Sequence, residues 1–519
     1  MYGLKLVPFR LTQILKAKMA RKPLKQSTLY ITNRMEADDE SQLIARREIL
    51  ARVGPGVSIA LALVAGLALR LWMLREFFDP SGDPLIYGGL AKNMLLHGSY
   101  ALTGSDGVMH STLIRLPGYP LFLAACFSIF GMENYVSAAW VQIALELAGC
   151  LLLADFAGRI ARRTGFSRGA AHATLWLAAL CPFTAIYAAQ PMSESLTLFV
   201  LALALWSVAR FCDRPGWAPA LGFTFAVSYA ALLRPDGALA ALALAPALFV
   251  GLRRAEAKAE AISTRKLARM AVVCVLLALT PFAVWTWRNE RVFHVFEPLA
   301  PRLATDPDEN PHYGWERWVK SWCLDFVSTY QIYWNVPGAN LDINELPERA
   351  FDSPAQYAET AKLAADYNQA QDLTPEIDSR FDRLADERIA AHPLRSYLWL
   401  PLGRVADMWL RPRVENLPID LDWWVYANHN EETRFSWAYA GLNALYLLLG
   451  FAGLMLRPRF WRPMLAYFVL RSAMLMTVEA PEARYTLECF PMLFALGGVA
   501  VAWASQRAAG LAWIYKRPF

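Results

Sequence analysis

The sequence predicts an all-α polytopic membrane protein with about ten transmembrane helices. The 519-residue chain is 56% hydrophobic, and several of its apolar runs approach the ~20 residues that cross a bilayer core as a helix. Its basic residues gather between these runs, which is the pattern that orients a membrane protein. The net charge of +6 therefore reflects topology, and nucleic acid is not expected as a partner.

Ten segments are long and apolar enough to be predicted as spans. They are residues 53–75, 136–157, 169–189, 194–212, 217–233, 237–252, 269–287, 437–456, 462–478 and 486–504. With a cytoplasmic N-terminus, the basic loops Arg159–Arg168, Arg253–Arg269 and Arg457–Arg462 and the basic C-terminal tail all fall on the cytoplasmic side. This agreement with the positive-inside rule supports the count.

Two further apolar segments are excluded from the spans. Gly118–Gly131 has only about 14 residues and prolines at its start, so it is predicted as a re-entrant or interfacial helix. Leu394–Leu410 contains Arg395, Arg404 and Asp407, and it is predicted as an amphipathic helix at the outer surface. Counting either one as a span would place basic loops on the wrong side.

The spans divide the chain into four parts. Residues 1–50 form a cytoplasmic tail that is expected to be disordered, with Met35 as an alternative start. Residues 51–290 form a transmembrane module with a large first loop, 76–135. Residues 291–436 form a mostly helical extracytoplasmic domain or lid, in which Asp352–Ser353–Pro354 begins a helix. Residues 437–519 hold the last helices and a cytoplasmic tail.

The first outer loop carries two aspartates next to the membrane. Asp83 can serve as a general base, bind a cation or orient a sugar hydroxyl, but Asp83–Pro84 also fits a helix N-cap followed by proline. Tyr87 lies one helical turn later and shares its face. Asp79 precedes Pro80 and is equally able to be a turn residue.

The same loop ends in Arg115–Leu–Pro–Gly–Tyr119–Pro120. An arginine at a membrane surface suits a lipid-linked phosphate, because its planar fork can hold two phosphate oxygens. The alternative is a snorkelling anchor to lipid headgroups.

Three short loops on the same predicted side carry further charges. They contain Glu194, Arg234–Pro235–Asp236 and Glu479–Ala–Pro–Glu482–Ala–Arg484–Tyr485. Away from them, Glu146 falls near the middle of the second span, where a protonated glutamate that faces Gln142 or a neighbouring helix is the simpler interpretation. His294 and His312 are expected to be solvated surface residues.

The seven cysteines are scattered and form no CxxC pair or Cys/His cluster. Neither a disulfide framework nor a zinc site is therefore indicated. The sequence also shows no compact ligand set, so it indicates neither a metal nor another cofactor, and a divalent metal stays open as an alternative.

Taken in order, these motifs resemble the GT-C superfamily of polytopic glycosyltransferases. The carriers are Asp83-x-x-x-Tyr87, Arg115-x-Pro-Gly-Tyr-Pro120, Pro191-x-x-Glu194, Leu233–Arg234–Pro235 and Arg484–Tyr485. The similarity covers residues 53–290 and 437–504, and it is strongest to the branch with protein O-mannosyltransferases and the lipid A aminoarabinose transferase. Mannosyltransferases have Asp-Glu at the catalytic position, whereas this chain has Asp83–Pro84, which argues against a protein mannosyltransferase.

The resemblance implies an inverting hexosyl- or pentosyltransferase that moves a sugar from a polyprenyl-phosphate carrier to an extracytoplasmic glycan, lipid or protein. Asp83 would be the general base, with the active site on the outer face of a bacterial inner membrane. Arg115 and Arg484 would contact the carrier phosphate. The full set of expected substrate-binding residues is Asp79, Tyr87, Arg115, Tyr119, Glu194, Arg234, Glu482, Arg484 and Tyr485.

Two other classes of function use the same features differently. A flippase or transporter of a lipid-linked or polar substrate would use the charged outer surface but needs a path across the bilayer, and the spans carry few central ionisable groups. A membrane scaffold with a partner-binding outer domain would not need the motifs in this order.

Overall fold

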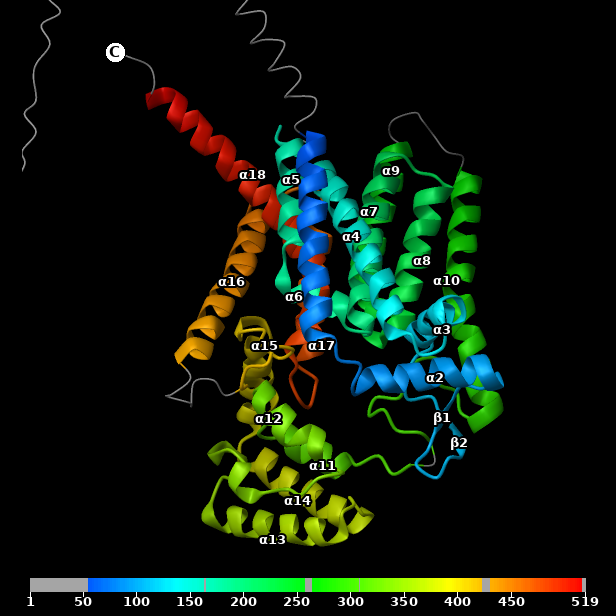
Figure 1. Cartoon of the computed structure of the whole chain (residues 1–519), viewed down its shortest axis with the longest axis vertical. Helices are drawn as coiled ribbons and strands as arrows, with labels where there is room; N and C mark the ends of the chain where they lie inside the picture. Colours follow the sequence, from blue (N-terminus) through cyan, green and yellow to red (C-terminus); the bar gives the residue numbers. More distant parts are fainter. Residues whose placement is uncertain (1–54, 163–164, 257–263, 308, 422–429, 516–519) are drawn as a thin grey trace, which may run out of the picture. The chain divides into compact units, whose positions relative to one another are not determined.

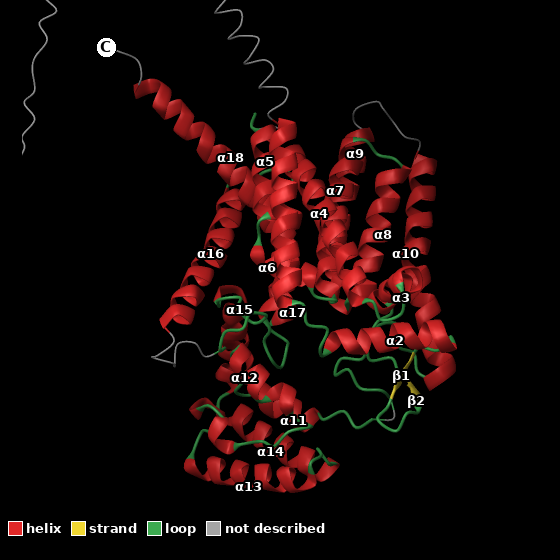
Figure 2. Cartoon of the chain, in the orientation of Figure 1, coloured by secondary structure: helices red, strands yellow, loops and turns green. Residues whose placement is uncertain are grey.

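The computed structural model describes residues 55–515 except 163–164, 257–263, 308 and 422–429. The predicted tail 1–50 and the alternative start at Met35 lie outside the described residues. Residues from Ile59 onward form one compact unit. Within it Figure 2 shows helices joined by loops, and the strands of the described residues form one small hairpin.

Eleven α-helices make up the apolar part of the described chain. They are Pro55–Phe77, α4 (Tyr135–Ile160), α5 (Ser167–Ala179), α6 (Pro182–Ala189), α7 (Ser193–Asp213), α8 (Trp217–Leu233), α9 (Ala238–Glu256), α10 (Thr264–Phe293), α16 (Asn430–Met455), α17 (Trp461–Leu475) and α18 (Phe490–Tyr515). Short 3₁₀ turns precede two of them, η2 (Pro235–Gly237) before α9 and η7 (Ala483–Cys489) before α18.

Six of these helices are long and apolar enough to cross a membrane, and the bent pair α5–α6 makes a seventh if it is one span. The chain is therefore an all-α polytopic membrane protein. The other three predicted spans are helical too, but α8 and α17 have only 17 and 15 residues, and α9 has a short apolar part. The prediction of ten spans thus exceeds the number that meets the length and apolarity expected of a crossing helix.

The helices differ in what surrounds them. In the most apolar part of the helical stretch formed by η7 and α18, 83% of the residues are buried inside the protein. In the most apolar part of α10 only 6% are buried, so α10 faces lipid. Close approach at α18 depends on small residues: a Cβ at Gly453 of α16 would clash with the backbone of Leu496, and one at Gly498 with Thr174 of α5. Such contacts favour helix association where the hydrophobic effect is weak.

The first loop folds as α2 (Asp83–His97), the antiparallel hairpin β1 (Ala101–Thr103) and β2 (Met109–Ser111), and α3 (Gly118–Phe130). Figure 1 shows α2 running crosswise to α8 and α10. α3 has 13 residues, which is too short to span a bilayer, as the sequence predicts.

The long outer segment contains α11 (Tyr313–Lys320), α12 (Phe326–Gln331), α13 (Pro354–Ala370), α14 (Pro375–Ala391) and α15 (Leu400–Leu410). Short turns η3 (Tyr333–Asn335), η4 (Ile343–Glu345), η5 (Glu348–Ala350) and η6 (Arg395–Trp399) connect them. It packs a hydrophobic core of its own around Trp315, Trp318 and Phe381. The predicted helix start is confirmed, because the Ser353 hydroxyl caps α13 by accepting from Gln356 N.

Glu146 faces a neighbouring helix, which is one of the two arrangements expected for it. Its carboxylate accepts a hydrogen bond of 2.8 Å from Nε of Arg70 in the helix Pro55–Phe77, and this arginine partner is what the sequence does not predict. Arg70 is fully buried and also donates to the carbonyls of Gly66 and Ala179. Two charges that would each be costly in a membrane interior are therefore paired with one another.

Candidate active site

Asp83 lies between two arginines that come from distant parts of the sequence. Its Oδ1 accepts from Arg115 Nη2 at 3.0 Å, and its Oδ2 accepts from Arg484 Nη1 at 3.3 Å. Asp83 is the first residue of α2, and the residue that caps this helix is Gly82, with no side-chain cap bond. The N-cap alternative for Asp83 is therefore wrong, and its carboxylate is free to bridge the two guanidinium groups.

The ion pairs continue from Arg484 into the other outer loops. Arg484 Nη1 lies 3.8 Å from Oε1 of Glu194, and its Nε contacts Glu482. Glu194 Oε1 also accepts from Arg234 Nη1 at 3.3 Å. The guanidinium groups of Arg234 and Arg484 both lie over the ring of Tyr485, at 5.2 and 5.8 Å from its centroid.

Three charged residues extend this network beyond the set expected as ligands. Arg471 of α17 is fully buried and pairs with Asp236 at 2.5 Å and with Glu488 at 3.0 Å. Arg234 Nε in turn lies 3.4 Å from Asp236 and 3.2 Å from Glu488. Arg471 and Glu488 fall inside predicted spans, and their position as ionisable residues in apolar segments is the signal that could have identified them.

We call this set the outer charge network. Its members are five carboxylates and four guanidinium groups, contributed by Asp83, Glu194, Asp236, Glu482 and Glu488 and by Arg115, Arg234, Arg471 and Arg484. All nine side chains are at most 27% exposed, so the ion pairs are only weakly screened by water.

The network controls the ionisation of Asp83. Burial opposes the charged form, but the positive charges of Arg484 and Arg115 outweigh it and hold the pKa of this carboxyl below its ordinary value. Asp83 is therefore a carboxylate at neutral pH. Loss of either arginine would raise its pKa and make it a stronger base.

Arg115 is positioned by the fold of the first loop. Its backbone carbonyl accepts a 2.9 Å hydrogen bond from the hydroxyl of Tyr100, whose ring packs edge-on against Trp285 of α10. Arg288, one turn further along α10, donates to the carbonyls of Tyr100 and Thr112 at 2.8 and 2.9 Å. α10 thus fixes the end of the loop that carries the guanidinium.

Arg484 is positioned by a buried arginine behind η7. Arg413 donates to the carbonyl of Ala483 at 2.8 Å and to the hydroxyl of Thr486, and its guanidinium lies 4.9 Å from the ring centroid of Phe490. Arg471 adds a bond of 3.0 Å to the carbonyl of Tyr485. Arg413 itself makes no ion pair with the described members of the network. Its hydrogen bonds to Ala483 and Thr486 stabilise the turn η7.

The tyrosines of the predicted site occupy different positions. Tyr87 is close enough to Asp83 and Arg115 for their charges to affect its pKa, and it packs edge-on against Tyr119 with centroids 5.0 Å apart. Tyr119 is 1% exposed, and its hydroxyl is 2.5 Å from Oε1 of Gln142. Tyr119 therefore packs beside Tyr87 and makes its hydrogen bond to Gln142, which is not a member of the network.

Asp79 stands apart from the network. Its side chain is exposed and accepts from the hydroxyl of Ser81 at 2.8 Å, while its backbone N–H donates to Gln190. These are the contacts of a turn residue. The structure thus brings together six of the predicted residues around Asp83, places Tyr87 and Tyr119 beside them, and leaves Asp79 outside.

Two further glutamates lie next to one another near this site, Glu316 of the outer segment and Glu479 of the loop between α17 and η7. Both carboxylate oxygens of Glu316 accept from the hydroxyl of Tyr333, at 2.9 and 3.0 Å, and burial raises the pKa of Glu316 to about 7. The neighbouring Glu479 is neutralised by Lys320 and Arg302 at 3.1 and 2.5 Å. Glu316 itself forms no ion pair among the described residues.

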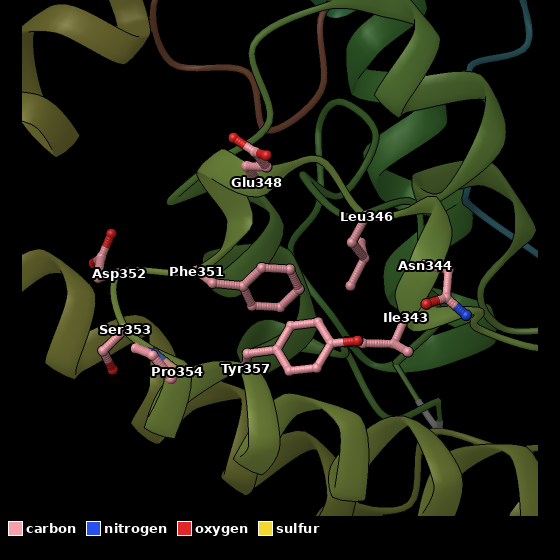
Figure 3. Close-up of a pocket in the computed structure, with 9 residues that line it drawn as sticks. All are labelled: Ile343, Asn344, Leu346, Glu348, Phe351, Asp352, Ser353, Pro354 and Tyr357. Carbon is pink, nitrogen blue, oxygen red and sulfur yellow. The ribbon is translucent and has the colours of Figure 1, made fainter.

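A separate groove of about 480 Å³ opens on the outer segment. In Figure 3 the rings of Phe351 and Tyr357 approach one another across it, between Leu346 and Ile343, with Glu348 and Asp352 at the edge. Asp352 is already paired with Arg395 at 2.6 Å. This groove shares no lining residue with the outer charge network.

No family model and no curated relative matches the chain. Two crystal structures of ArnT from Cupriavidus metallidurans are similar to it, each at 16% identity. The alignment with the structure bound to undecaprenyl phosphate covers 89% of this chain and 79% of the ArnT chain, with a TM-score of 0.35. The alignment with the apo structure covers 87% of this chain and 77% of the ArnT chain, with a TM-score of 0.34. Likeness at this level transfers neither a residue role nor an activity to the chain.

Proposed function

We propose that the chain is a membrane glycosyltransferase that moves a sugar from a polyprenyl-phosphate carrier to an acceptor hydroxyl. The observation that carries this proposal is the placement of Asp83 between Arg115 and Arg484. This placement brings a carboxylate that can act as a base next to two guanidinium groups that can bind a phosphate. Transfer of a sugar from a lipid phosphate uses both kinds of group. The reaction is proposed to occur at the extracytoplasmic face of a bacterial plasma membrane.

In this mechanism Arg115 and Arg484 hold the carrier phosphate next to Asp83. The acceptor oxygen forms a bond to the anomeric carbon, and the bond from that carbon to the phosphate oxygen breaks. Its electron pair stays on the phosphate, where the two guanidinium groups stabilise the developing charge. Attack from the face opposite the phosphate inverts the configuration of the sugar.

Asp83 takes the proton of the acceptor hydroxyl during this step. The low pKa of Asp83 depends on the same two arginines, so a bound phosphate that shares them raises this pKa and makes the carboxylate a better base. Donor binding and activation of the base are thereby linked through shared cations.

The remaining carboxylates are proposed to orient the sugar and the acceptor. Glu194 has an Oε2 that is buried without a hydrogen-bond partner in the described structure, so it can accept from a sugar hydroxyl. It begins α7, where the helix dipole stabilises its charge. Glu482 already accepts from the hydroxyl of Tyr485 and contacts Arg484. We therefore assign Glu482 and Tyr485 the role of positioning Arg484.

The alternative is a flippase or transporter of a lipid-linked or polar substrate. Such a protein needs polar groups along a path through its spans. Inside the described spans, the ion pair of Arg70 with Glu146 is joined by a hydrogen bond of 2.8 Å, and Arg70 is fully buried. This pair offers no polar path, which favours the transferase.

Purified protein in detergent micelles distinguishes the two functions, because micelles have no second compartment to receive a transported substrate. The protein is incubated with a panel of polyprenyl-phosphate sugars and candidate acceptors. Release of free polyprenyl phosphate together with a glycosylated acceptor supports the transferase. Sugar lipids that stay intact here but cross the bilayer of proteoliposomes would establish the transporter.

A further inference from the structure

A second group of arginines lies in the turn between α16 and α17. This turn, which we call the basic turn, is Arg457–Pro–Arg459–Phe–Trp461–Arg462. It forms one wall of a groove of about 700 Å³, and the facing wall is the apolar side of α9 with Leu242, Pro246 and Val250.

The groove lies far from the outer charge network. Cys212 near the end of α7 lines it, whereas Glu194 of the network begins α7. Eighteen residues at about 1.5 Å each separate the two by about 27 Å along the helix. That distance is close to the thickness of a bilayer core, about 30 Å, so the groove opens at the opposite membrane surface.

The three arginines of the turn have different partners. Arg459 is held by Asp213, which also accepts from Arg159 at 2.7 Å. Arg457 and Arg462 are exposed and contact the ring of Trp461, at 5.7 and 5.4 Å from its centroid. Neither has a carboxylate partner among the described residues, so both guanidinium groups are available to an anion.

The turn is rigid rather than a flexible tether. Arg457 and Phe460 have positive φ angles of 49° and 69°, which non-glycine residues adopt only where surrounding contacts impose them. Those contacts are the ring of Phe460 against Phe156, at 6.3 Å, and a bond of 3.3 Å from Arg459 N to the carbonyl of Ile160. The backbone from which Arg457 and Arg462 extend is therefore fixed by contacts within the protein.

Two other arginine–tryptophan pairs at the same membrane surface allow a comparison with the basic turn. Arg210 lies over Trp206 at 5.2 Å and Arg507 over Trp503 at 5.0 Å. Both arginines are exposed, but neither lines the groove. They have the contacts of ordinary interfacial anchors, without an adjoining apolar wall.

We propose that the groove binds one anionic phospholipid. Its phosphate lies between Arg457 and Arg462, whose forks match phosphate oxygens, and its acyl chain lies along Leu242, Pro246 and Val250. A soluble phosphate would make no use of the apolar wall, and a neutral lipid would leave the excess positive charge of the turn uncompensated.

Native mass spectrometry of the full chain tests this with an equal mixture of phosphatidylglycerol and phosphatidylcholine. The wild type is expected to retain phosphatidylglycerol preferentially. Arg457→Gln with Arg462→Gln is expected to reduce that preference about tenfold, as loss of charge-assisted hydrogen bonds predicts. The matched control, Arg210→Gln with Arg507→Gln, removes the same charge from the same surface and should keep it.

A second variant tests the apolar wall without changing any charge. Leu242→Trp fills the groove at a residue that is 61% exposed, and it should displace the bound lipid while the unfolding midpoint stays unchanged. Equal preference in the two double variants would overturn the proposal in favour of general surface charge. Inorganic phosphate that displaces the lipid at equal concentration would overturn it in favour of a soluble anion. Neither result depends on sugar transfer.

Discussion

The two ends of the helical bundle use arginine in opposite ways. In the outer charge network, Arg471 is fully buried and its guanidinium is neutralised by Asp236 and Glu488. In the basic turn, Arg457 is exposed, contacts the ring of Trp461 and has no carboxylate partner among the described residues. The comparison indicates that a buried, paired arginine fixes the geometry of a site, whereas an exposed arginine without a carboxylate partner is available to bind an anion.

The largest expected difference between the ends is in stability. Arg471→Met removes one of the two guanidinium partners of the buried Asp236 and Glu488 and leaves Arg234 as the other. Removal of one member of a buried pair costs about 3–5 kcal/mol. Arg457→Met removes an exposed side chain and should change the free energy of unfolding by about 0.5 kcal/mol or less. Reversible unfolding in mixed micelles measures both.

A double variant sharpens this test. Arg471→Met combined with Glu488→Gln also removes one of the two carboxylates that Arg471 pairs with and should recover part of the lost stability. If Arg471→Met and Arg457→Met are equally mild, the outer charge network is not the buried ion-pair system described here.

The next largest effect concerns the carrier. Arg115→Gln removes one phosphate contact and should weaken binding of undecaprenyl phosphate about 10- to 100-fold, the range for a charge-assisted hydrogen bond. Arg75→Gln is the matched control, because Arg75 is 84% exposed and pairs only with its neighbour Glu76. Isothermal titration in micelles measures the affinities, and an unchanged value for Arg115→Gln would place the phosphate elsewhere.

A smaller effect is expected in the pH dependence. Because Arg484 and Arg115 lower the pKa of Asp83, kcat/KM should stay level through neutral pH and fall only below the ordinary carboxyl range. Arg115→Gln raises this pKa, so the acid limb of the profile should move to higher pH, by about one unit for one lost ion pair. An acid limb that does not move would remove Asp83 as the titrating base.

The smallest effect is expected from removal of divalent cations. Each carboxylate of the outer charge network has an arginine partner, and the sequence indicates no metal ligand set. Chelation with EDTA should therefore change the rate of transfer by less than about twofold. A rate that collapses with EDTA and returns with Mg²⁺ or Mn²⁺ would show that the arginines alone do not neutralise the phosphate.

The sequence predicts much of this arrangement because its informative residues are in loops. Glu194, Arg234 and Arg484 lie at predicted span ends on one side of the membrane, so topology alone brings them to one surface. The orientation of Asp83 could not be predicted, because a cap and a catalytic carboxylate have the same local sequence. The structure excludes the cap, because Gly82 caps α2 and the Asp83 carboxylate contacts Arg115 and Arg484.

The spans are where prediction from sequence was weakest. The ion pairs of Arg70, Arg471 and Glu488 are not predicted by the sequence, because each residue lies in a mostly apolar segment. Their partners come from other helices, so the pairing is set by packing that no local pattern encodes. The short helices α8 and α17 were counted as full spans because apolarity does not fix where a helix ends.

The most direct test of the central claim is single-turnover transfer by Asp83→Asn. Loss of a general base should slow transfer about 10²- to 10⁴-fold, while carrier affinity and the unfolding midpoint stay close to those of the wild type. Asp106→Asn is the control, an exposed aspartate elsewhere in the same loop that should transfer at the normal rate. Wild-type transfer by a folded Asp83→Asn variant would contradict the account.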